Sequence, residues 1–136
     1  MMRLPTPLDD ETESVVEAII GCAIRVHREL GPGFLESTYR NALCLEFQKD
    51  HIQFETEKPV VVRYQNVPIA THRLDLVVSE RVILELKSVE RTSPVHRKQV
   101  QTYLRLSGCK LGYLLNFGDE LMKDGITRVV NGLEEE

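Results

Sequence analysis

Two carboxylates and a lysine lie close together in the stretch from Leu74 to Lys87, which reads LDLVVSERVILELK. Asp75 is in the first apolar half of this stretch, and Glu85 and Lys87 are in the second half. Hard divalent cations prefer oxygen ligands, so two neighbouring carboxylates can hold one. A lysine beside them can orient a water molecule or stabilise charge that develops on phosphorus. The residue types and their spacing therefore suit a metal-dependent phosphodiester site.

The same stretch predicts a β-hairpin, because a polar turn at residues 79–81 separates two apolar runs. Alternate residues of a strand face opposite sides, so the apolar residues of one parity must share the buried face. They are Leu74, Leu76, Val78, Val82, Leu84 and Leu86. With the turn centred on Glu80, Val78 lies opposite Val82 and Asp75 lies opposite Glu85. A register shifted by two residues would keep the faces and stagger the carboxylates.

Two carboxylates directly opposite each other are unfavourable in a sheet, so something should offset their repulsion. At about 5 Å and an effective dielectric near 20, that repulsion is roughly 3 kcal/mol. Lys87 and Arg73 could offset it as structural ion pairs, and a bound divalent cation could also do so. An ordinary cross-strand ion cluster of Asp75, Glu85 and Lys87 therefore stays open beside the metal site, because such clusters are common and weak.

The composition fits a single domain in a chain of 136 residues with a formal net charge of −4. We place this domain at residues 12–131, between a loose N-terminal arm at 1–11 and a solvated tail at 132–136. The charge excludes a protein that coats nucleic acid through bulk positive charge, but it allows local binding of a phosphate backbone.

The cysteines and the apolar runs indicate the compartment. The three cysteines are far apart and lack a CxxC spacing, so neither a disulfide framework nor a zinc site is expected. Free thiols suit a reducing cytosol. No apolar run approaches the ~18 residues of a membrane span. We therefore expect a cytoplasmic protein with no membrane association.

The periodicity of the apolar residues predicts a mixed sheet with helices packed on it. We expect an amphipathic helix at 12–30 and interpret His27 in its last turn as an ordinary polar residue. A turn is expected at residues 65–68. The other elements are a helix at 34–49, a strand at 53–64, the strand pair at 69–89, a helix at 93–107, and strands at 110–117 and 126–130.

Two helices carry further candidates. In the helix at 93–107, Gln99 and Tyr103 are four residues apart and so share one face. This helix is also the most basic stretch of the chain, and its charges suit either a solvated face or a local surface for phosphate contacts. Glu36, in the first turn of the helix at 34–49, fits simple complementation of the helix dipole.

A longer set of residues resembles a known family. Residues 33–39, GFLESTY, match the GxxExxY signature of the GxxExxY proteins. The similarity continues through the hairpin, through SPVHRKQVQTYLRLSG and KLGYLLNFG, and so covers about residues 15–131. The GxxExxY proteins are placed in the PD-(D/E)XK nuclease-like superfamily. The resemblance implies an α/β fold, with a mixed α+β sheet and a restriction-endonuclease-like core of order αβββαβ. An extra N-terminal helix and a C-terminal strand would extend that core.

The superfamily motif carries over onto residues of the hairpin. Asp75 matches the motif aspartate, and Glu85 and Lys87 match the (D/E)xK pair. Leu74 replaces the proline of the PD pair, which is a common departure. The resemblance implies that Asp75 and Glu85 hold Mg²⁺ or Mn²⁺ and that Lys87 orients or deprotonates the attacking water.

Outside the hairpin, the resemblance matches Glu36 to an acidic residue often found on the first core helix. Gln99 and Tyr103 match a QxxxY pattern of several nuclease branches. Glu36 would then add a metal ligand or a catalytic group, and the QxxxY pair would position the phosphate or the motif residues. Contacts with the nucleic-acid backbone are expected from three basic residues, which are Arg73, Arg97 and Lys98.

The implied activity is that of a divalent-metal-dependent nuclease that hydrolyses phosphodiester bonds of DNA or RNA. Fold alone does not establish activity, so the alternative is a non-catalytic module that binds nucleic acid or protein. Many small nucleases of this fold act as dimers, and a homodimer is compatible with the resemblance.

Overall fold

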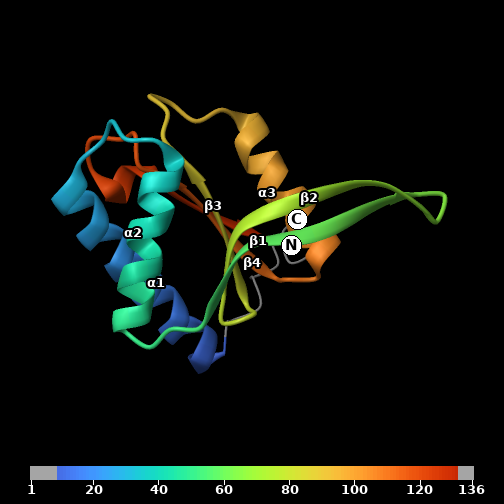
Figure 1. The fold of residues 1–136 in the computed structure, drawn as a ribbon, viewed down its shortest axis with the longest axis horizontal. Helices are drawn as coiled ribbons and strands as arrows, with labels where there is room; N and C mark the ends of the chain where they lie inside the picture. Colours follow the sequence, from blue (N-terminus) through green and yellow to red (C-terminus); the bar gives the residue numbers. More distant parts are fainter. Residues whose placement is uncertain (1–8, 132–136) are drawn as a thin grey trace, which may run out of the picture.

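A five-stranded sheet covered by three α-helices makes up the computed structural model, which describes residues 9–131 (Figure 1). Residues 1–8 and 132–136, which belong to the predicted arm and tail, lie outside the described residues. The elements are α1 (Asp10–Leu30), α2 (Glu36–Lys49), β1 (Phe54–Tyr64), β2 (Val67–Val78), β3 (Val82–Lys87), α3 (Pro94–Ser107), β4 (Leu111–Asn116), the short 3₁₀ helix η1 (Met122–Gly125) and β5 (Ile126–Val130). The predicted mixed α+β fold, consistent with a restriction-endonuclease-like core, is confirmed.

Helix α1 begins two residues before the predicted helix, because Asp9 caps it. The Oδ1 atom of Asp9 accepts a hydrogen bond from the main-chain N–H of Thr12 at 2.7 Å, and acidic residues fill the first turn. Asp10 and Glu11 therefore belong to the helix, with Asp9 as its cap, and not to the loose arm predicted at 1–11. Gly31 ends the helix at a φ of 68°, a left-handed value that favours glycine.

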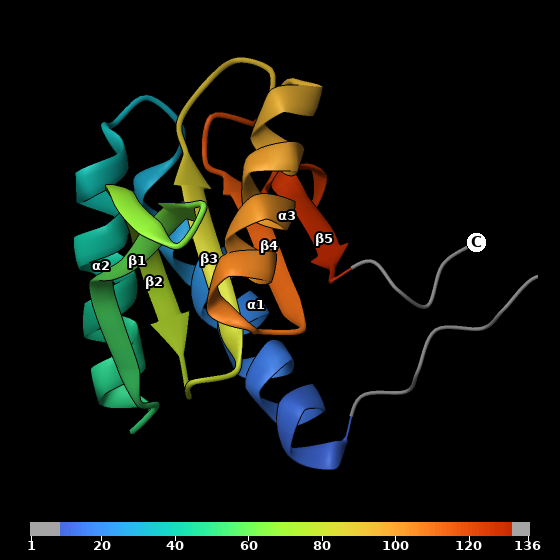
Figure 2. The same cartoon turned by 90° about the vertical axis from the view of Figure 1, so that its right-hand side faces the viewer.

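The sheet has the strand order β1-β2-β3-β4-β5 and is covered on both faces (Figure 2). β3 and β4 are parallel and are connected through α3, whereas the other neighbouring strands are antiparallel. Helices α1 and α2 pack on one face through residues such as Ile19 and Leu43, and α3 packs on the other through Val100 and Leu104. The central strands are therefore buried on both sides, which explains the nearly continuous apolar run of β4.

The hairpin of β2 and β3 has the predicted register. Its Cα partners are Leu76 with Leu84, Val77 with Ile83, and Val78 with Val82. Leu74, however, does not share the face of Leu76, because it packs with Val77 in the cluster beneath α3. Among residues 9–131, β2 beyond Leu76 pairs with β1 and no longer with β3, so the alternation fixed by pairing with β3 does not extend to Leu74.

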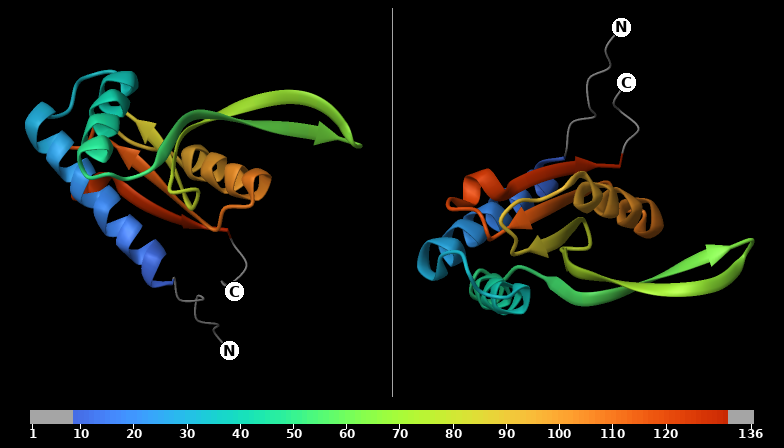
Figure 3. Two further views of the ribbon diagram at one scale, coloured as in Figure 1. Left: turned by 60° about the horizontal axis from the view of Figure 1, so that its bottom comes forward. Right: turned by 90° about the horizontal axis from the view of Figure 1, so that it is seen from above.

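β1 and the first part of β2 form a long two-stranded ribbon that extends away from the body of the molecule (Figures 1 and 3). Its turn consists of Gln65 and Asn66 alone, with φ values of 50° and 67°. The predicted turn at 65–68 is therefore two residues too long, since Val67 and Pro68 already belong to β2. Pro68 is tolerated because this ribbon is at the edge of the sheet, where a missing N–H donor costs little.

Candidate active site

β2 and β3 part at Asp75 and Glu85, and the two carboxylates close the gap between the strands. The main-chain N–H of Asp75 donates a hydrogen bond to Oε2 of Glu85 at 3.0 Å. The main-chain N–H of Leu86 donates one to Oδ2 of Asp75 at 2.9 Å. Each carboxylate thus accepts from the strand opposite its own, and the reciprocal contacts fix the pair in place.

The surroundings of this pair disfavour two negative charges. Glu85 is only 4% exposed, and burial followed by the charge of Asp75 raises the pKa of Glu85 from 4.5 to about 8. Burial also raises the pKa of Asp75, although the hydrogen bond from Leu86 and the charge of Lys87 act in the opposite direction. A positive charge between the carboxylates would favour their ionised forms.

Lys87 is the half-buried last residue of β3, with Asn116 at the end of β4 as its Cα partner. Its charge lowers the pKa values of both Asp75 and Glu85, so the three groups lie within electrostatic reach. Among residues 9–131, no ion pair within 4 Å joins Lys87 or Arg73 to a carboxylate. Neither basic residue therefore neutralises the acidic pair through the direct ion pairs considered from the sequence.

Glu36 is the exposed first residue of α2, and the GxxExxY tyrosine holds the loop before it. The hydroxyl of Tyr39 donates a hydrogen bond to the carbonyl of Gly31 and accepts one from the N–H of Phe34 at 3.2 Å. Ser88, just after β3, donates to the carbonyl of Phe34. This loop therefore fixes the start of α2 beside the end of β3, as Figure 2 shows.

Gln99 and Tyr103 lie together on the face of α3 that approaches β2. The amide of Gln99 donates to the Tyr103 hydroxyl at 3.1 Å, and Nδ1 of His72 is 3.5 Å from that hydroxyl. Burial, and then the charge of Glu85, raises the pKa of Tyr103. The QxxxY pair is thus a connected unit within electrostatic reach of the carboxylates, and His72 is a neighbour that the sequence did not single out.

The three residues predicted to contact nucleic acid are all exposed. Arg97 and Lys98 are in the first turns of α3, and Arg73 is in the ribbon opposite Pro59. Arg40 of α2 was missed from the sequence, although its charge lowers the pKa of Asp75. Its spacing four residues after Glu36, on one helix face, was the available signal.

Asn116 is a second residue that the sequence left unassigned. It is 1% exposed, and its side chain exchanges hydrogen bonds with both main-chain groups of Val89, at 3.0 and 2.9 Å. Its amide also donates to Asp119 at 2.9 Å. The available signal was an asparagine that ends an otherwise apolar strand. Asn116 therefore holds the segment after Lys87 against the end of β4.

His27 has the structural role expected from the sequence, but it is buried. Its Nε2 atom lies 2.8 Å from the carbonyl oxygen of Asp119, and its ring is 6.2 Å from that of Phe117. It joins the end of α1 to the loop after β4. Nothing in these contacts brings it to the carboxylate pair.

The carboxylate pair fits a hard divalent cation. Oδ1 of Asp75 and Oε1 of Glu85 have no hydrogen-bond partner among the described residues, although Glu85 is buried. Buried oxygens without a donor are costly and suit a cation. Within residues 9–131, no group of three or more His, Cys, Asp or Glu side chains is placed to hold a metal. Two of the three predicted ligands are therefore in contact, and Glu36 is near them without joining a three-residue group.

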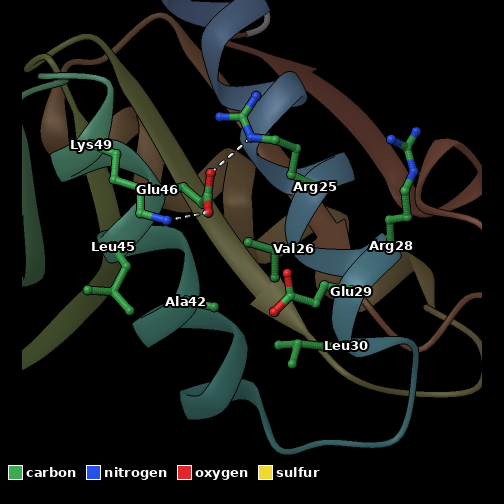
Figure 4. A pocket seen from close by; sticks show the side chains of 9 residues that line it. All are labelled: Arg25, Val26, Arg28, Glu29, Leu30, Ala42, Leu45, Glu46 and Lys49. Atoms are coloured by element: carbon green, nitrogen blue, oxygen red, sulfur yellow. Dashed lines mark hydrogen bonds and ion pairs between the residues drawn. The ribbon is translucent and has the colours of Figure 1, made fainter.

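A hollow between α1 and α2 lies outside this site (Figure 4). Three of its charged lining residues are paired with one another, because Glu46 contacts Arg25 at 2.9 Å and Lys49 at 3.8 Å. None of the candidate site residues lines it.

Three comparisons relate the chain to known proteins. A model of the PD-(D/E)XK nuclease superfamily matches residues 13–129. No curated protein matches the chain. Two chains of solved structures match, one of them the crystal structure of SSO0001, with 17% identity and a TM-score of 0.47. That alignment covers 88% of this chain and 66% of the other, so the chain spans about two thirds of the length of SSO0001.

No helix within residues 9–131 is both long and apolar enough to cross a membrane.

Proposed function

The chain belongs to the PD-(D/E)XK nuclease superfamily, and we propose that it is a divalent-metal-dependent nuclease that hydrolyses phosphodiester bonds of nucleic acid. One observation carries the proposal: Asp75 and Glu85 form a fixed, partly buried pair, two of whose oxygens have no hydrogen-bond partner among residues 9–131, and Lys87 lies within electrostatic reach. Ordinary surface ion clusters have no need of such burial.

Asp75 and Glu85 would hold Mg²⁺ or Mn²⁺, with Glu36 reaching it through water. The ion would supply Lewis-acid activation of the phosphate and of a bound water. The Lys87 amine, which has no ion pair among the described residues, would orient that water or stabilise charge on phosphorus.

Gln99 and Tyr103 would orient the phosphate. The hydrogen bond that the Gln99 amide donates to the Tyr103 hydroxyl fixes the two side chains relative to each other. In the described part of the chain no side chain caps the N-terminal end of α2, which adds main-chain N–H groups near the end of β3. Such groups are suited to an anionic backbone.

Within the superfamily, we place the chain among the GxxExxY proteins. Gly33, Glu36 and Tyr39 support this, since the tyrosine fixes the loop that begins the helix of the glutamate. The free cysteines are compatible with the cytoplasmic location that we propose. A homodimer stays a prediction.

The test is cleavage of end-labelled DNA and RNA, single- and double-stranded, by the full chain with Mg²⁺ or Mn²⁺. We expect Lys87→Ala to lower the cleavage rate by about 10³-fold, because one transition-state donor is lost. Thermal stability should be unchanged. The matched control is Lys123→Ala, an exposed lysine of η1 that should cleave like the wild type.

Undiminished cleavage by Lys87→Ala would sink the assignment. Metal binding is measured in a separate experiment, through the rise in the thermal midpoint of unfolding. A metal at a hundred times its Kd adds about 2.7 kcal/mol to the free energy of unfolding. Asp75→Asn should abolish this gain. If the wild type neither cleaves nor gains stability with Mn²⁺, the non-catalytic module is the better description.

A further inference from the structure

Basic and acidic residues are segregated along this chain. Residues 58–74 and 91–118 contain no Asp or Glu and eight basic residues. These are Lys58, Arg63, Arg73, Arg91, Arg97, Lys98, Arg105 and Lys110. All 21 acidic residues share the rest of the chain with the remaining nine Lys and Arg. The chain therefore has two segments whose charged residues are all basic, although its overall charge is −4.

The fold brings these two segments together. Residues 58–74 form the outer part of the β1–β2 ribbon, and residues 91–118 include α3. α3 packs against the base of the ribbon, where Val60 joins the apolar cluster of Val100 and Leu104. The rings of His72 and Tyr103 also lie 6.0 Å apart at this junction. Among residues 9–131, the only ion pair made by these eight basic residues joins Lys58 to Glu55.

The outer ribbon is exposed to solvent, although His72 at its base contacts Tyr103. Every residue from 63 to 73 is exposed, and both Figure 1 and Figure 3 show the ribbon extending beyond the body. The segment from Val67 to Leu74 spans about 25 Å at ~3.3 Å per residue, which exceeds the ~8.5 Å depth of a DNA major groove. Arg63 and Tyr64 lie beside its turn.

We infer that the β1–β2 ribbon and α3 bind double-stranded DNA, with the ribbon in the major groove and α3 on the adjoining phosphates. This rests on the proposed nuclease function and names its substrate class. A two-stranded ribbon fits the wide major groove of B-form DNA, whereas the major groove of A-form RNA is too narrow. The exposed apolar side chains of Val67 and Ile69 suit contacts with thymine methyl groups.

The arrangement sets where such a duplex would be cut. Asp75 comes directly after the basic stretch of β2, at the point where the ribbon leaves β3. A duplex held along the ribbon and α3 would therefore have its backbone near the carboxylate pair. The rest of the chain has 21 acidic residues against nine Lys and Arg, so its net negative charge disfavours phosphate binding elsewhere.

The test is fluorescence anisotropy of labelled duplex DNA, duplex RNA and single-stranded DNA with the full chain in EDTA, where metal-dependent cleavage cannot occur. We expect at least about tenfold tighter binding to duplex DNA than to duplex RNA. Arg63→Ala should weaken duplex DNA binding by about tenfold and reduce the slope of log K against log salt by about one. Lys123→Ala is the matched control and should bind as the wild type does.

Equal binding of duplex RNA, or unchanged binding by Arg63→Ala, overturns the inference. So does a dimer in sedimentation that Arg63→Ala or Ile69→Ser converts to monomer, because the ribbon would then pair two copies. Cleavage with Mn²⁺ separates the two proposals. If the Arg63→Ala variant cleaves duplex DNA as fast as the wild type, the nuclease proposal stands and the role of the ribbon is contradicted. If duplex binding depends on Arg63 but the wild type does not cleave, the role of the ribbon stands and the nuclease proposal is contradicted.

Discussion

The two faces of β2 and β3 differ sharply, although their residues alternate along the same strands. Toward α1 and α2, Leu76, Leu84 and Leu86 lie in a continuous apolar cluster. Toward α3, the apolar cluster is smaller, and Glu85 follows Ile83 on that side of the strand. One helix covers less of a sheet than two do, and the carboxylate pair of half-buried Asp75 and buried Glu85 lies on this less covered face.

The alternation of the strand therefore separates residues that stabilise the fold from the carboxylates of the candidate site. Leu84 and Glu85 are neighbours in β3 and both are buried. Burial favours folding for the leucine and opposes it for the charged glutamate. At neutral pH, removing the leucine side chain should therefore lower the free energy of unfolding, whereas neutralising the glutamate should raise it.

Leu84→Ala should have the largest effect on stability. Leu84 is fully buried beneath α1 and α2, and truncation leaves a cavity, so we expect a loss of about 3 kcal/mol in the free energy of unfolding. Urea denaturation measures it. The control is Leu45→Ala on α2, where the side chain is 60% exposed and the expected change is below about 0.5 kcal/mol. Equal losses of unfolding free energy for Leu84→Ala and Leu45→Ala would contradict the role of the buried face.

Glu85→Gln should remove most of the pH dependence of stability. The pKa of Glu85 is about 8 in the folded protein against an ordinary value of 4.5, so the folded state holds its proton more firmly. Wild-type stability should therefore fall as the pH rises from 4.5 through 8, because ionising Glu85 costs more in the folded than in the unfolded state. Glutamine carries no titrating proton, so thermal unfolding of the variant should change much less over this range. A wild type that gains stability toward pH 8 would contradict the assignment.

Of the substitutions Leu84→Ala, Glu85→Gln and Tyr39→Phe, the last should change the free energy of unfolding least. Its ring would still stack on Phe117, at 4.4 Å between centroids, while the hydrogen bonds to Gly31 and Phe34 would be lost. We expect a cost of about 1 kcal/mol by urea denaturation. A several-fold loss of cleavage should accompany it, because the loop before Glu36 loosens. Tyr64→Phe, on the exposed ribbon, is the control for stability and should unfold like the wild type.

The fold was largely predictable from the sequence because its elements have strong periodic signals. The parity of the apolar residues and a single polar turn were enough to pair Val78 with Val82. Ser93, Pro94 and Gly108 delimited α3 correctly, since caps act locally. The fold class follows from the order of these elements.

The errors arise where several parts of the chain act together. The face of Leu74 depends on where β2 leaves β3, which no local pattern encodes. The clamp that Asn116 makes on Val89 joins segments 27 residues apart. The sequence pattern predicted that Asp75 lies opposite Glu85. The main-chain hydrogen bonds that hold the two carboxylates were not predictable, because they depend on the separation of the strands. The roles of the site residues remain proposals.

The parallel pairing of β3 with β4 has a consequence for the order of folding. The pairs of β1 with β2 and of β2 with β3 join segments adjacent in the chain, and their loops close quickly. β3 and β4 are parallel and separated in the chain by α3, so their pairing needs a crossover over the sheet. Such non-local pairing is intrinsically slow. We expect the two carboxylates to meet early in refolding, and Lys87 to reach its final position only when the centre of the sheet closes.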